Sequence, residues 1–364
     1  MAFHTPPEVL LRSVIRTLRS SSAQNFVKQE CAGRRFYRAA VCTKIGDPLQ
    51  VQDVPLPDKV PDGKVLIAGH AAGINFADIL TVQGKYQVRP RTPFVPGAEL
   101  AGRVADFGAG VEGFKKGDRV ISIPGGMNAF GEFCLVDAHM VFPAPDTLTL
   151  VECAGAIISY ATAMLALSRT AQLKEGETVL ITAAAGATGL AAADIARNVF
   201  RAQVIGVCGG ADKCALLRER GVQHTIDYHT EEIRDRVKKI TDGNGVDVVM
   251  DQVGGNIFTD CLKSVAFEGR VVTVGYASGD IPKVPVNQVL LKSCSIRGVW
   301  WGNYATRNPQ VFIQSITDVL AAFSQGKLRP HIGRTFSLEE VNAAFDFILN
   351  RQSTGKVVLK MRDE

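Results

Sequence analysis

The chain has 364 residues, of which 46% are hydrophobic and 21% charged, a composition typical of a globular protein with room for two domains. Its formal net charge of +5 resides entirely in the first 38 residues, so the remainder is neutral. A neutral body argues against a nucleic-acid partner. Since no apolar run looks long enough to cross a bilayer, we also expect no membrane span.

Residues 1–37 are predicted to be an N-terminal extension. Arg12, Arg16 and Arg19 recur at helical spacing, apolar residues follow the same spacing on another face, and serines are frequent while acidic residues are rare. This pattern is typical of a mitochondrial transit peptide and predicts that the protein is imported into the mitochondrial matrix. A helical or disordered extension on a cytoplasmic protein is the alternative.

The next part of the chain is rich in short strands. Glycine-containing turns separate the predicted strands Arg38–Thr43, Pro48–Pro57, Lys64–Gly73, Pro96–Ala109, Asp118–Ile123 and Gly131–Asp137. Many short strands at close intervals predict a compact, partly open β-barrel domain. It is followed by a long Ala-rich segment, Thr149–Ala171, which is predicted to form a pair of apolar helices.

From residue 178 onward, apolar strands alternate with helices. The predicted strands are Val179–Thr182, Gln203–Cys208, Thr225–Tyr228, Val246–Asp251, Gly269–Gly275 and Ser295–Val299. The predicted helices between them lie near Gly189–Phe200, Lys213–Arg220, Glu231–Ile240 and Ile257–Phe267. Continuous apolar strands joined by helical crossovers predict a doubly wound, six-stranded parallel sheet of an α/β fold, which we assign to residues 160–300.

The C-terminal part contains two further predicted helices, Pro309–Phe323 and Leu338–Leu349. A final predicted strand, Gly355–Met361, is expected to return to the first domain. The β-rich domain would therefore comprise residues 38–159 and 301–364.

A small-residue turn follows the first strand of the predicted parallel sheet. Ala184, Gly186 and Gly189 occupy the three positions of a G-x-G-x-x-G pattern, with Ala in the first. A tight turn of small residues lets the backbone approach a pyrophosphate, and the following helix directs its free N–H groups at the phosphates. The candidate cofactor-binding residues of this turn are Ala185, Gly186, Ala187, Thr188 and Gly189.

Three stretches resemble the medium-chain dehydrogenase/reductase superfamily, in particular the zinc-free quinone oxidoreductases of the ζ-crystallin type. They are Gly73–Tyr86, Pro93–Val120 and the turn Ala183–Gly189, and they occur in the order found in that superfamily. The resemblance covers roughly residues 38–361. It implies a GroES-like catalytic domain, a Rossmann domain for a nicotinamide dinucleotide, and a homodimer formed through the edge strand Ser295–Val299, although tetramers also occur.

Zinc alcohol dehydrogenases of the superfamily have Cys where this chain has Asn75 or Phe76, and His where it has Ala98. Asn and Ala supply neither the thiolate nor the imidazole that zinc prefers, so no metal site is expected. Reduction of a quinone or an α,β-unsaturated carbonyl by direct hydride delivery fits better than alcohol oxidation.

NADPH is the expected cofactor. NAD-preferring Rossmann sites place a carboxylate about 20 residues after the glycine turn, where this chain has Gly209 and Gly210. Lys213 and Tyr228 stand where the zinc-free family uses Lys and Tyr for the 2′-phosphate, although Asp212 departs from a purely basic site. The resemblance also implies cofactor contacts by a further set of residues, Asn75, Thr162, Gly275, Tyr276, Ala277 and Lys356.

The candidate catalytic residues are Tyr86 and Asn75. Tyr86 lies in QGKY, which resembles the stretch that carries the proposed proton donor of mitochondrial enoyl-thioester reductases. Three functions therefore stay open: a reductase of small quinones or enones, an enoyl-thioester reductase with Arg89 and Arg91 at its mouth, and an NADPH-binding protein with little turnover.

The chain has eight cysteines, and none of them forms a C-x-x-C pair. We interpret them as reduced, structural cysteines of an intracellular protein.

Overall fold

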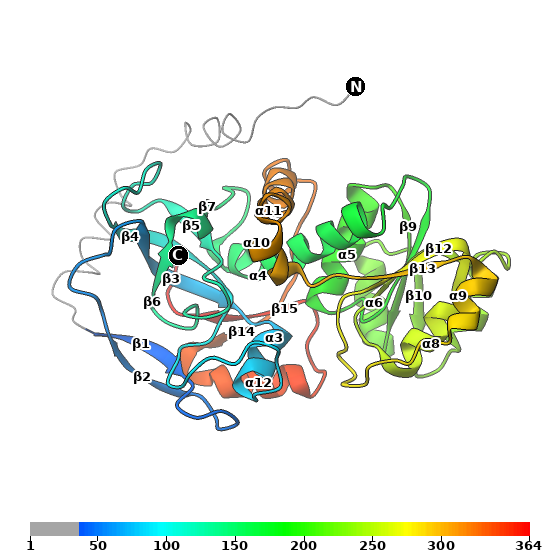
Figure 1. Cartoon of the computed structure of the whole chain (residues 1–364), viewed down its shortest axis with the longest axis horizontal. Coiled ribbons are helices and arrows are strands. Elements are labelled where there is room, and N and C mark those ends of the chain that lie inside the picture. Colours follow the sequence, from blue (N-terminus) through cyan, green and yellow to red (C-terminus); the bar gives the residue numbers. More distant parts are fainter. Residues whose placement is uncertain (1–35) are drawn as a thin grey trace.

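The computed structural model describes residues 36–364, so the predicted targeting segment, apart from its last two residues, lies outside the described part. Figure 1 shows two sheet-containing units side by side, with helices packed between them. The superfamily resemblance predicts this arrangement of a GroES-like unit and a Rossmann unit, and the structure confirms it.

The first unit is built around one long strand, β3 (Lys64–Gly73), which is buried along nearly its whole length. It pairs antiparallel with three other strands, and this explains its continuous apolar sequence. The sheet order is β14-β15-β3-β4-β5-β7, with β6 also on β3. Its other strands are β4 (Glu99–Phe107), β5 (Arg119–Ser122), β6 (Phe133–Asp137), β7 (Val141–Pro143), β14 (Ile332–Ser337) and β15 (Lys356–Lys360).

A separate two-stranded sheet pairs β1 (Phe36–Val41) with β2 (Gln50–Pro55). Strand β1 begins two residues before the predicted start at Arg38. Tyr37 belongs to the strand because its ring packs edge-on against Phe133, with centroids 5.9 Å apart. At the other end of the chain, β15 pairs antiparallel with β3, which confirms the predicted return of the C-terminal strand.

The second unit is a six-stranded parallel sheet in the order β10-β9-β8-β11-β12-β13. Its strands are β8 (Thr178–Ile181), β9 (Gln203–Cys208), β10 (His224–Asp227), β11 (Val246–Asp251), β12 (Val265–Thr273) and β13 (Ser295–Gly298). Its helices are α5 (Ala187–Asn198), α6 (Ala211–Glu219), α7 (Ile233–Ile240), α8 (Gly255–Ser264) and α9 (Val286–Lys292). The strand order reverses direction at β8, and ligands of such sheets bind outside the strand ends at this point.

The Ala-rich segment forms one continuous helix, so the predicted helix pair is wrong. Helix α4 (Leu150–Leu165) continues directly into a π-helical turn, Ala166–Thr170. The hydroxyl of Thr149 accepts the Glu152 N–H at the start of α4, which defines its N-terminus. Residues 156–175 contain no glycine or proline, so nothing in the sequence ends the helix at the junction of Leu165 and Ala166.

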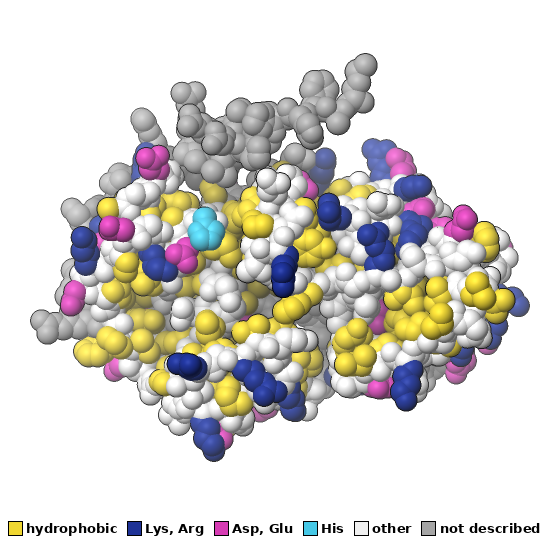
Figure 2. Space-filling model, in the orientation of Figure 1, with side chains coloured by type: hydrophobic (Ala, Val, Ile, Leu, Met, Phe, Trp, Pro, Cys, Tyr) yellow, Lys and Arg dark blue, Asp and Glu magenta, His cyan; other side chains and the backbone are white. Residues whose placement is uncertain are grey.

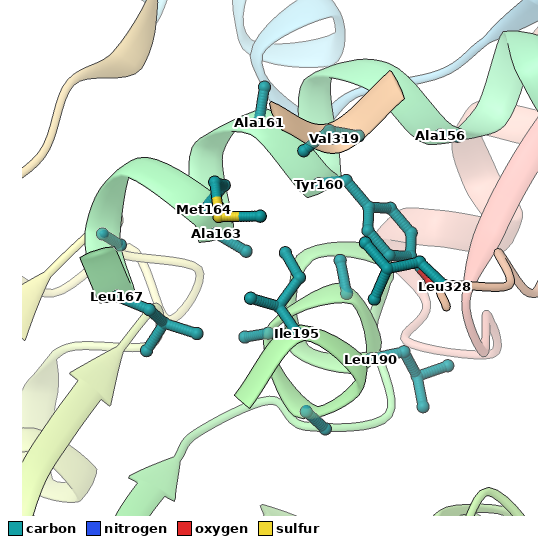
Figure 3. Packing of buried hydrophobic residues seen from close by; sticks show 14 of the residues in the cluster. Ala156, Tyr160, Ala161, Ala163, Met164, Leu167, Leu190, Ile195, Val319 and Leu328 are labelled. Atoms are coloured by element: carbon teal, nitrogen blue, oxygen red, sulfur yellow. The ribbon is translucent and has the colours of Figure 1, made fainter. Parts of the chain in front are cut away.

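This helix forms the centre of the molecule. Side chains from α4, including Tyr160 and Met164, pack against α5 and against α11 (Pro309–Ser324), as Figure 3 shows for Ile195 and Val319. By length and composition, residues 150–170 would suffice to cross a membrane, so the expectation that no apolar run reaches that length is wrong. However, 78% of the most apolar window of this helix is buried inside the protein, as expected of a core helix.

Within residues 36–364, sequence patterns missed five short helices and strands. They are α3 (Phe76–Val82), β7, α9, α10 (Tyr304–Arg307) and β14. The predicted helix Leu338–Leu349 consists of a 3₁₀ turn followed by α12 (Val341–Leu349). None of the missed elements is long enough to show a clear periodicity.

Candidate functional site

The turn between β8 and α5 lies at the reversal point of the parallel sheet. Gly189, in the first turn of α5, packs so closely on this turn that an added Cβ would lie 2.3 Å from the carbonyl oxygen of Ala183. Ala183 itself has a φ of 46°, in the left-handed region. The turn is thus closed by backbone-to-backbone contact, and the N-terminal N–H groups of α5 stand at its mouth.

A segment from the other unit touches the same turn. The N–H of Gly355 donates to the carbonyl of Ala185 at 2.8 Å, and Gly355 forms an isolated parallel bridge with Gly186. Ala185 and Gly186, both predicted cofactor residues, therefore lie where the two units meet. We call this boundary, at the carboxyl ends of the parallel strands, the crevice. The turn has the small residues and the free helix N-terminus that a pyrophosphate requires.

The carboxyl end of β9 carries the predicted ribose site. Gly209 faces the Tyr228 ring so closely that an added Cβ would lie 2.6 Å from its hydroxyl oxygen. Gly210 has a φ of 100°, and its N–H donates to an oxygen of Asp227 at 2.9 Å. That hydrogen bond lowers the pKa of the Asp227 carboxyl. The structure thus brings Gly209 and Tyr228 together, as the sequence predicts.

Lys213 lies on the first turn of α6 and reaches across the crevice. Its ammonium group donates to the carbonyl oxygen of Arg351 at 2.7 Å. Arg351 is exposed and has a φ of 56°. Sequence reasoning missed Arg351, although it precedes the Gly355-Lys356 pair by only four residues. Lys213 and Arg351 therefore come from different units, and their backbones meet next to the predicted 2′-phosphate position.

A buried polar group lies at the carboxyl ends of β8 and β11, beside the glycine turn. The Thr182 hydroxyl, at the end of β8, donates to Asp251 at 2.8 Å, and the backbone N–H groups of Val253 and Gly254 donate to the same carboxylate. Burial raises the pKa of Asp251. The sequence shows no motif for this group, which fixes the loop after β11 beside the glycine turn.

The predicted residues after β12 lie along that loop. Ala277 donates its N–H to the carbonyl of Gln252 at 2.9 Å, and the Tyr276 side chain is 39% exposed. Gly275 lies near the same carbonyl, with room for a Cβ at 3.7 Å. Thr162 is half-buried on α4. These placements leave Tyr276 available to a ligand in the crevice.

A second polar group is buried where α3, β4, α4 and β15 meet. Lys356 donates to the amide oxygen of Asn75 at 2.7 Å and to Glu99 at 2.5 Å. The Asn75 amide nitrogen donates to the same Glu99 oxygen at 3.0 Å, while the other oxygen accepts the Ile158 N–H at 2.9 Å. Lys356 is 2% exposed and Glu99 is fully buried. We call these residues, Asn75, Glu99 and Lys356, the inner cluster.

The inner cluster changes the roles expected of two residues. Both polar atoms of the Asn75 side chain are engaged inside the protein, so its amide is held in one orientation. Lys356 is directed at Asn75 and Glu99 rather than outward, which argues against the direct cofactor contact expected of it. Glu99 was not among the predicted site residues, because a single glutamate in a strand resembles many others.

Asp78 stands beside this cluster in the first turn of α3. Its carboxylate accepts the backbone N–H of Asn75 at 2.8 Å. Burial raises the pKa of Asp78 to about 7. The start of α3 is thus fixed directly after Asn75.

Tyr86 lies four residues past the end of the same helix. Its hydroxyl accepts the indole N–H of Trp300 at 3.2 Å, and burial raises the pKa of Tyr86. Trp300 is 46% exposed, whereas Trp301 is buried against Phe312 and donates to Ser315. The two tryptophans therefore differ: Trp300 is partly exposed beside Tyr86, and Trp301 belongs to the core.

Comparison with known proteins agrees with this fold. Residues 61–146 match the family "Alcohol dehydrogenase GroES-like domain", and residues 187–319 match the family "Zinc-binding dehydrogenase". "Quinone oxidoreductase-like protein 2 homolog" of Nematostella vectensis is 43% identical over 99% of both chains. "Quinone oxidoreductase-like protein 2" of Mus musculus is 44% identical over 90% of this chain and 93% of its own.

The chain belongs to the medium-chain dehydrogenase/reductase superfamily, among the quinone oxidoreductase-like proteins. Solved structures of the superfamily share its fold. That of mycobacterial Rv1454c complexed with NADPH has a TM-score of 0.81 at 29% identity and covers 89% of this chain and 99% of its own. That of CurK enoyl reductase has a TM-score of 0.80 at 26% identity and covers 90% and 100%. The comparisons support an oxidoreductase that uses a nicotinamide cofactor.

Proposed function

We propose that this quinone oxidoreductase-like protein is an NADPH-dependent reductase that delivers hydride to a quinone or an α,β-unsaturated carbonyl without zinc. The observation that carries the proposal is the end of β9, where Gly209 and Gly210 stand in place of an NAD-type carboxylate. Gly209 packs on Tyr228, and Lys213 begins the helix that follows. The Asp227 carboxylate nearby already accepts two backbone N–H groups. A 2′-phosphate would thus meet a lysine and a tyrosine hydroxyl.

Two observations that do not depend on the family resemblance also support a dinucleotide in the crevice. Gly189 leaves no room for a Cβ, and the N-terminus of α5 is free to donate to phosphates. Lys213 would exchange the Arg351 carbonyl for the 2′-phosphate, and the guanidinium of Arg351 would add a second cation. Tyr276 and Thr162 would contact the nicotinamide end.

The inner cluster supports chemistry without zinc. Ala98 has no ligand atom, and Glu99 beside it is already paired with the Lys356 ammonium inside the protein. Among residues 36–364, no group of three or more His, Cys, Asp or Glu side chains could hold a metal ion. The chain itself thus supplies, in Lys356, the cation that neutralises the buried Glu99 carboxylate.

The residues can be assigned complementary tasks. When bound, NADPH supplies the hydride. Asn75, held by Lys356 and Glu99, would orient the nicotinamide end, and Trp300 would cover the substrate side. Tyr86 would donate a proton to the enolate that hydride addition leaves, because its hydroxyl accepts the Trp300 N–H and so keeps its own proton available to donate.

The test is oxidation of NADPH and NADH by the purified full chain with a 1,4-quinone, an enone and an enoyl thioester in parallel. We expect kcat/KM to be higher with NADPH, and the quinone or the enone to exceed the thioester. A preference for NADH would overturn the cofactor assignment. Loss of turnover after treatment with a zinc chelator would overturn the zinc-independent mechanism.

An enoyl-thioester reductase is the second candidate, favoured by the pairing of Tyr86 with Trp300 and by the likeness to CurK enoyl reductase. Tyr86→Phe separates a quinone from a substrate that leaves an enolate, such as the thioester. Turnover of the thioester should fall about tenfold or more if Tyr86 donates the proton, since general acid catalysis contributes at least that much. Quinone turnover should change less, because water can protonate a hydroquinone anion. Tight NADPH binding with no turnover of any acceptor would favour a binding protein instead.

We also propose a homodimer formed through β13 and α9. Strand β13 is a sheet edge, and Figure 2 shows hydrophobic side chains gathered over this region. On α9, Val286, Leu290 and Leu291 are 71%, 77% and 70% exposed. A second copy placed edge to edge would cover them. Light scattering should show a dimer that Leu290→Glu converts to a monomer, while Leu349→Glu, on α12, should not. A monomeric parent chain would contradict the proposal.

The division into a catalytic unit (residues 38–159 and 301–364) and a cofactor unit (residues 160–300) stays a proposal, as does mitochondrial targeting by the extension. Fusing residues 1–37 to a fluorescent protein tests the targeting: a mitochondrial signal is expected, and a diffuse cytoplasmic signal would contradict it.

A further inference from the structure

Two cysteines flank the loop that carries the proposed 2′-phosphate site. Cys208 is the last residue of β9, and Cys214 lies on α6, one residue after Lys213. Their sulfur atoms are 3.2 Å apart, and both thiols are free. The five residues between them, 209–213, include Gly209, Gly210 and Lys213. The thiols thus face each other across the base of the ribose loop.

Both thiols are buried, with Cys208 2% and Cys214 4% exposed, but only one of them borders a surface hollow. Cys214 lines a surface hollow of about 460 Å³, together with Arg218, Arg236 and Asp227. Cys208 does not line the hollow, and burial is the main cause of its raised pKa. A small oxidant entering the hollow would therefore meet Cys214 first, with Cys208 behind it.

We propose that Cys208 and Cys214 are a redox-modification site that forms a disulfide on exposure to hydrogen peroxide and thereby weakens NADPH binding. The effect on NADPH rests on the proposed function, whereas disulfide formation does not.

The chemistry balances with the peroxide as the only co-reactant. The Cys214 sulfur attacks one peroxide oxygen, the O–O bond breaks, and water leaves, so that Cys214 becomes a sulfenic acid. The Cys208 sulfur then attacks the sulfenic sulfur, the S–O bond breaks, and the hydroxyl leaves as a second water with the proton of Cys208. Two thiols are oxidised to one disulfide, and one peroxide is reduced to two waters.

Disulfide formation would deform the ribose loop. The sulfurs must move from 3.2 Å to about 2.05 Å, which draws the first turn of α6 toward the end of β9. Lys213 lies within the closed ring, and Gly209 has no free space against Tyr228. Closing the disulfide therefore displaces Lys213 or Gly209. Since coupling between sites is reciprocal, bound cofactor should in turn slow the oxidation.

The test treats the full reduced chain with hydrogen peroxide, with and without NADP⁺, and follows intact mass, peptide mapping and NADPH KM. We expect a loss of about 2 Da assigned to the Cys208–Cys214 pair, since a disulfide lacks two thiol hydrogens. The NADPH KM should rise roughly tenfold, because displacements near 1 Å at a binding site have effects of this size or larger. A thiol reductant should reverse both changes, and NADP⁺ should slow them.

Cys208→Ala and Cys214→Ala should each abolish the mass loss and the KM change, whereas Cys42→Ala, a buried cysteine of the other unit, should abolish neither. The proposal is overturned if the peroxide-treated chain keeps both thiols, if the pair instead becomes sulfinic acid, or if the disulfide forms without changing KM. If the reduced chain binds no NADPH, the proposed function fails, while the mass measurement still decides whether the disulfide forms.

Discussion

The glycine turn after β8 and the inner cluster of Asn75, Glu99 and Lys356 lie at the two sides of the crevice, and they are built in opposite ways. The turn consists of small residues whose backbones touch, and its polar groups are directed outward. The cluster consists of long polar side chains that are buried and paired with one another. Gly355 and Lys356 connect the two, because Gly355 donates to the turn and Lys356 to the cluster.

The difference predicts how each region responds to substitution. In the turn, the binding groups are backbone atoms, so only a change of side-chain volume can disturb them. In the cluster, each charge depends on its partner, so a single neutralisation is worse than a double one. The following predictions test this contrast, from the largest expected effect to the smallest.

Lys356→Met should give the largest loss of stability. It leaves the buried Glu99 carboxylate without its cation, and breaking a buried ion pair in this way costs about 3–5 kcal/mol. Urea unfolding measures the loss. The double variant Glu99→Gln/Lys356→Met should recover most of the stability, because no unpaired charge remains. A double variant as unstable as the single one would show that pairing is not what stabilises the cluster.

Asp78→Asn should change how stability depends on pH. Because burial raises the pKa of Asp78 to about 7, above the value in the unfolded chain, its contribution to stability is complete below pH about 4 and is lost as pH rises to 7. Asn cannot ionise but keeps an oxygen for the Asn75 N–H. The variant should therefore gain about 2–4 kcal/mol on the parent between pH 4 and pH 8.

Urea unfolding at both pH values measures the Asp78 effect, with the exposed Asp62→Asn as control. An equal difference between parent and variant at pH 4 and pH 8 would contradict a buried, titrating Asp78.

Gly189→Ala should weaken NADPH binding about tenfold or more, a loss within the usual 1–3 kcal/mol of overpacking. In an ordinary helix this substitution stabilises, but here the Cβ would lie 2.3 Å from one backbone oxygen and 2.6 Å from the Cα of Ala184. Calorimetric titration measures the Kd. Gly302→Ala, where the nearest atom is 3.9 Å away, is the control and should bind normally. Unchanged affinity in Gly189→Ala would mean that the turn can open.

Lys213→Ala should lower the ratio of kcat/KM for NADPH over NADH by roughly tenfold, the usual contribution of a hydrogen bond to a charged group. The exposed Lys239→Ala on α7 is the matched control. If the ratio stays the same in Lys213→Ala, the 2′-phosphate is held elsewhere, and Arg351 is the next residue to change.

By itself, the sequence determined the architecture and the backbone-built half of the site. Apolar strands alternating with helices predict the parallel sheet, and a turn of small residues predicts the phosphate position, because both are local patterns of side-chain size and polarity. The match of Gly209, Lys213 and Tyr228 to the family also indicated where the ribose site would form, and the structure places them around one loop.

Only the tertiary structure decided the side-chain half. Asn75, Glu99 and Lys356 come from segments up to 281 residues apart, and no local pattern records that a glutamate in one strand will meet a lysine in another. The same holds for Arg351 beside Lys213, and for the single helix α4, whose length reflects burial between two units. Charges and long apolar segments acquire their roles from what surrounds them, and that depends on how distant parts of the chain pack together.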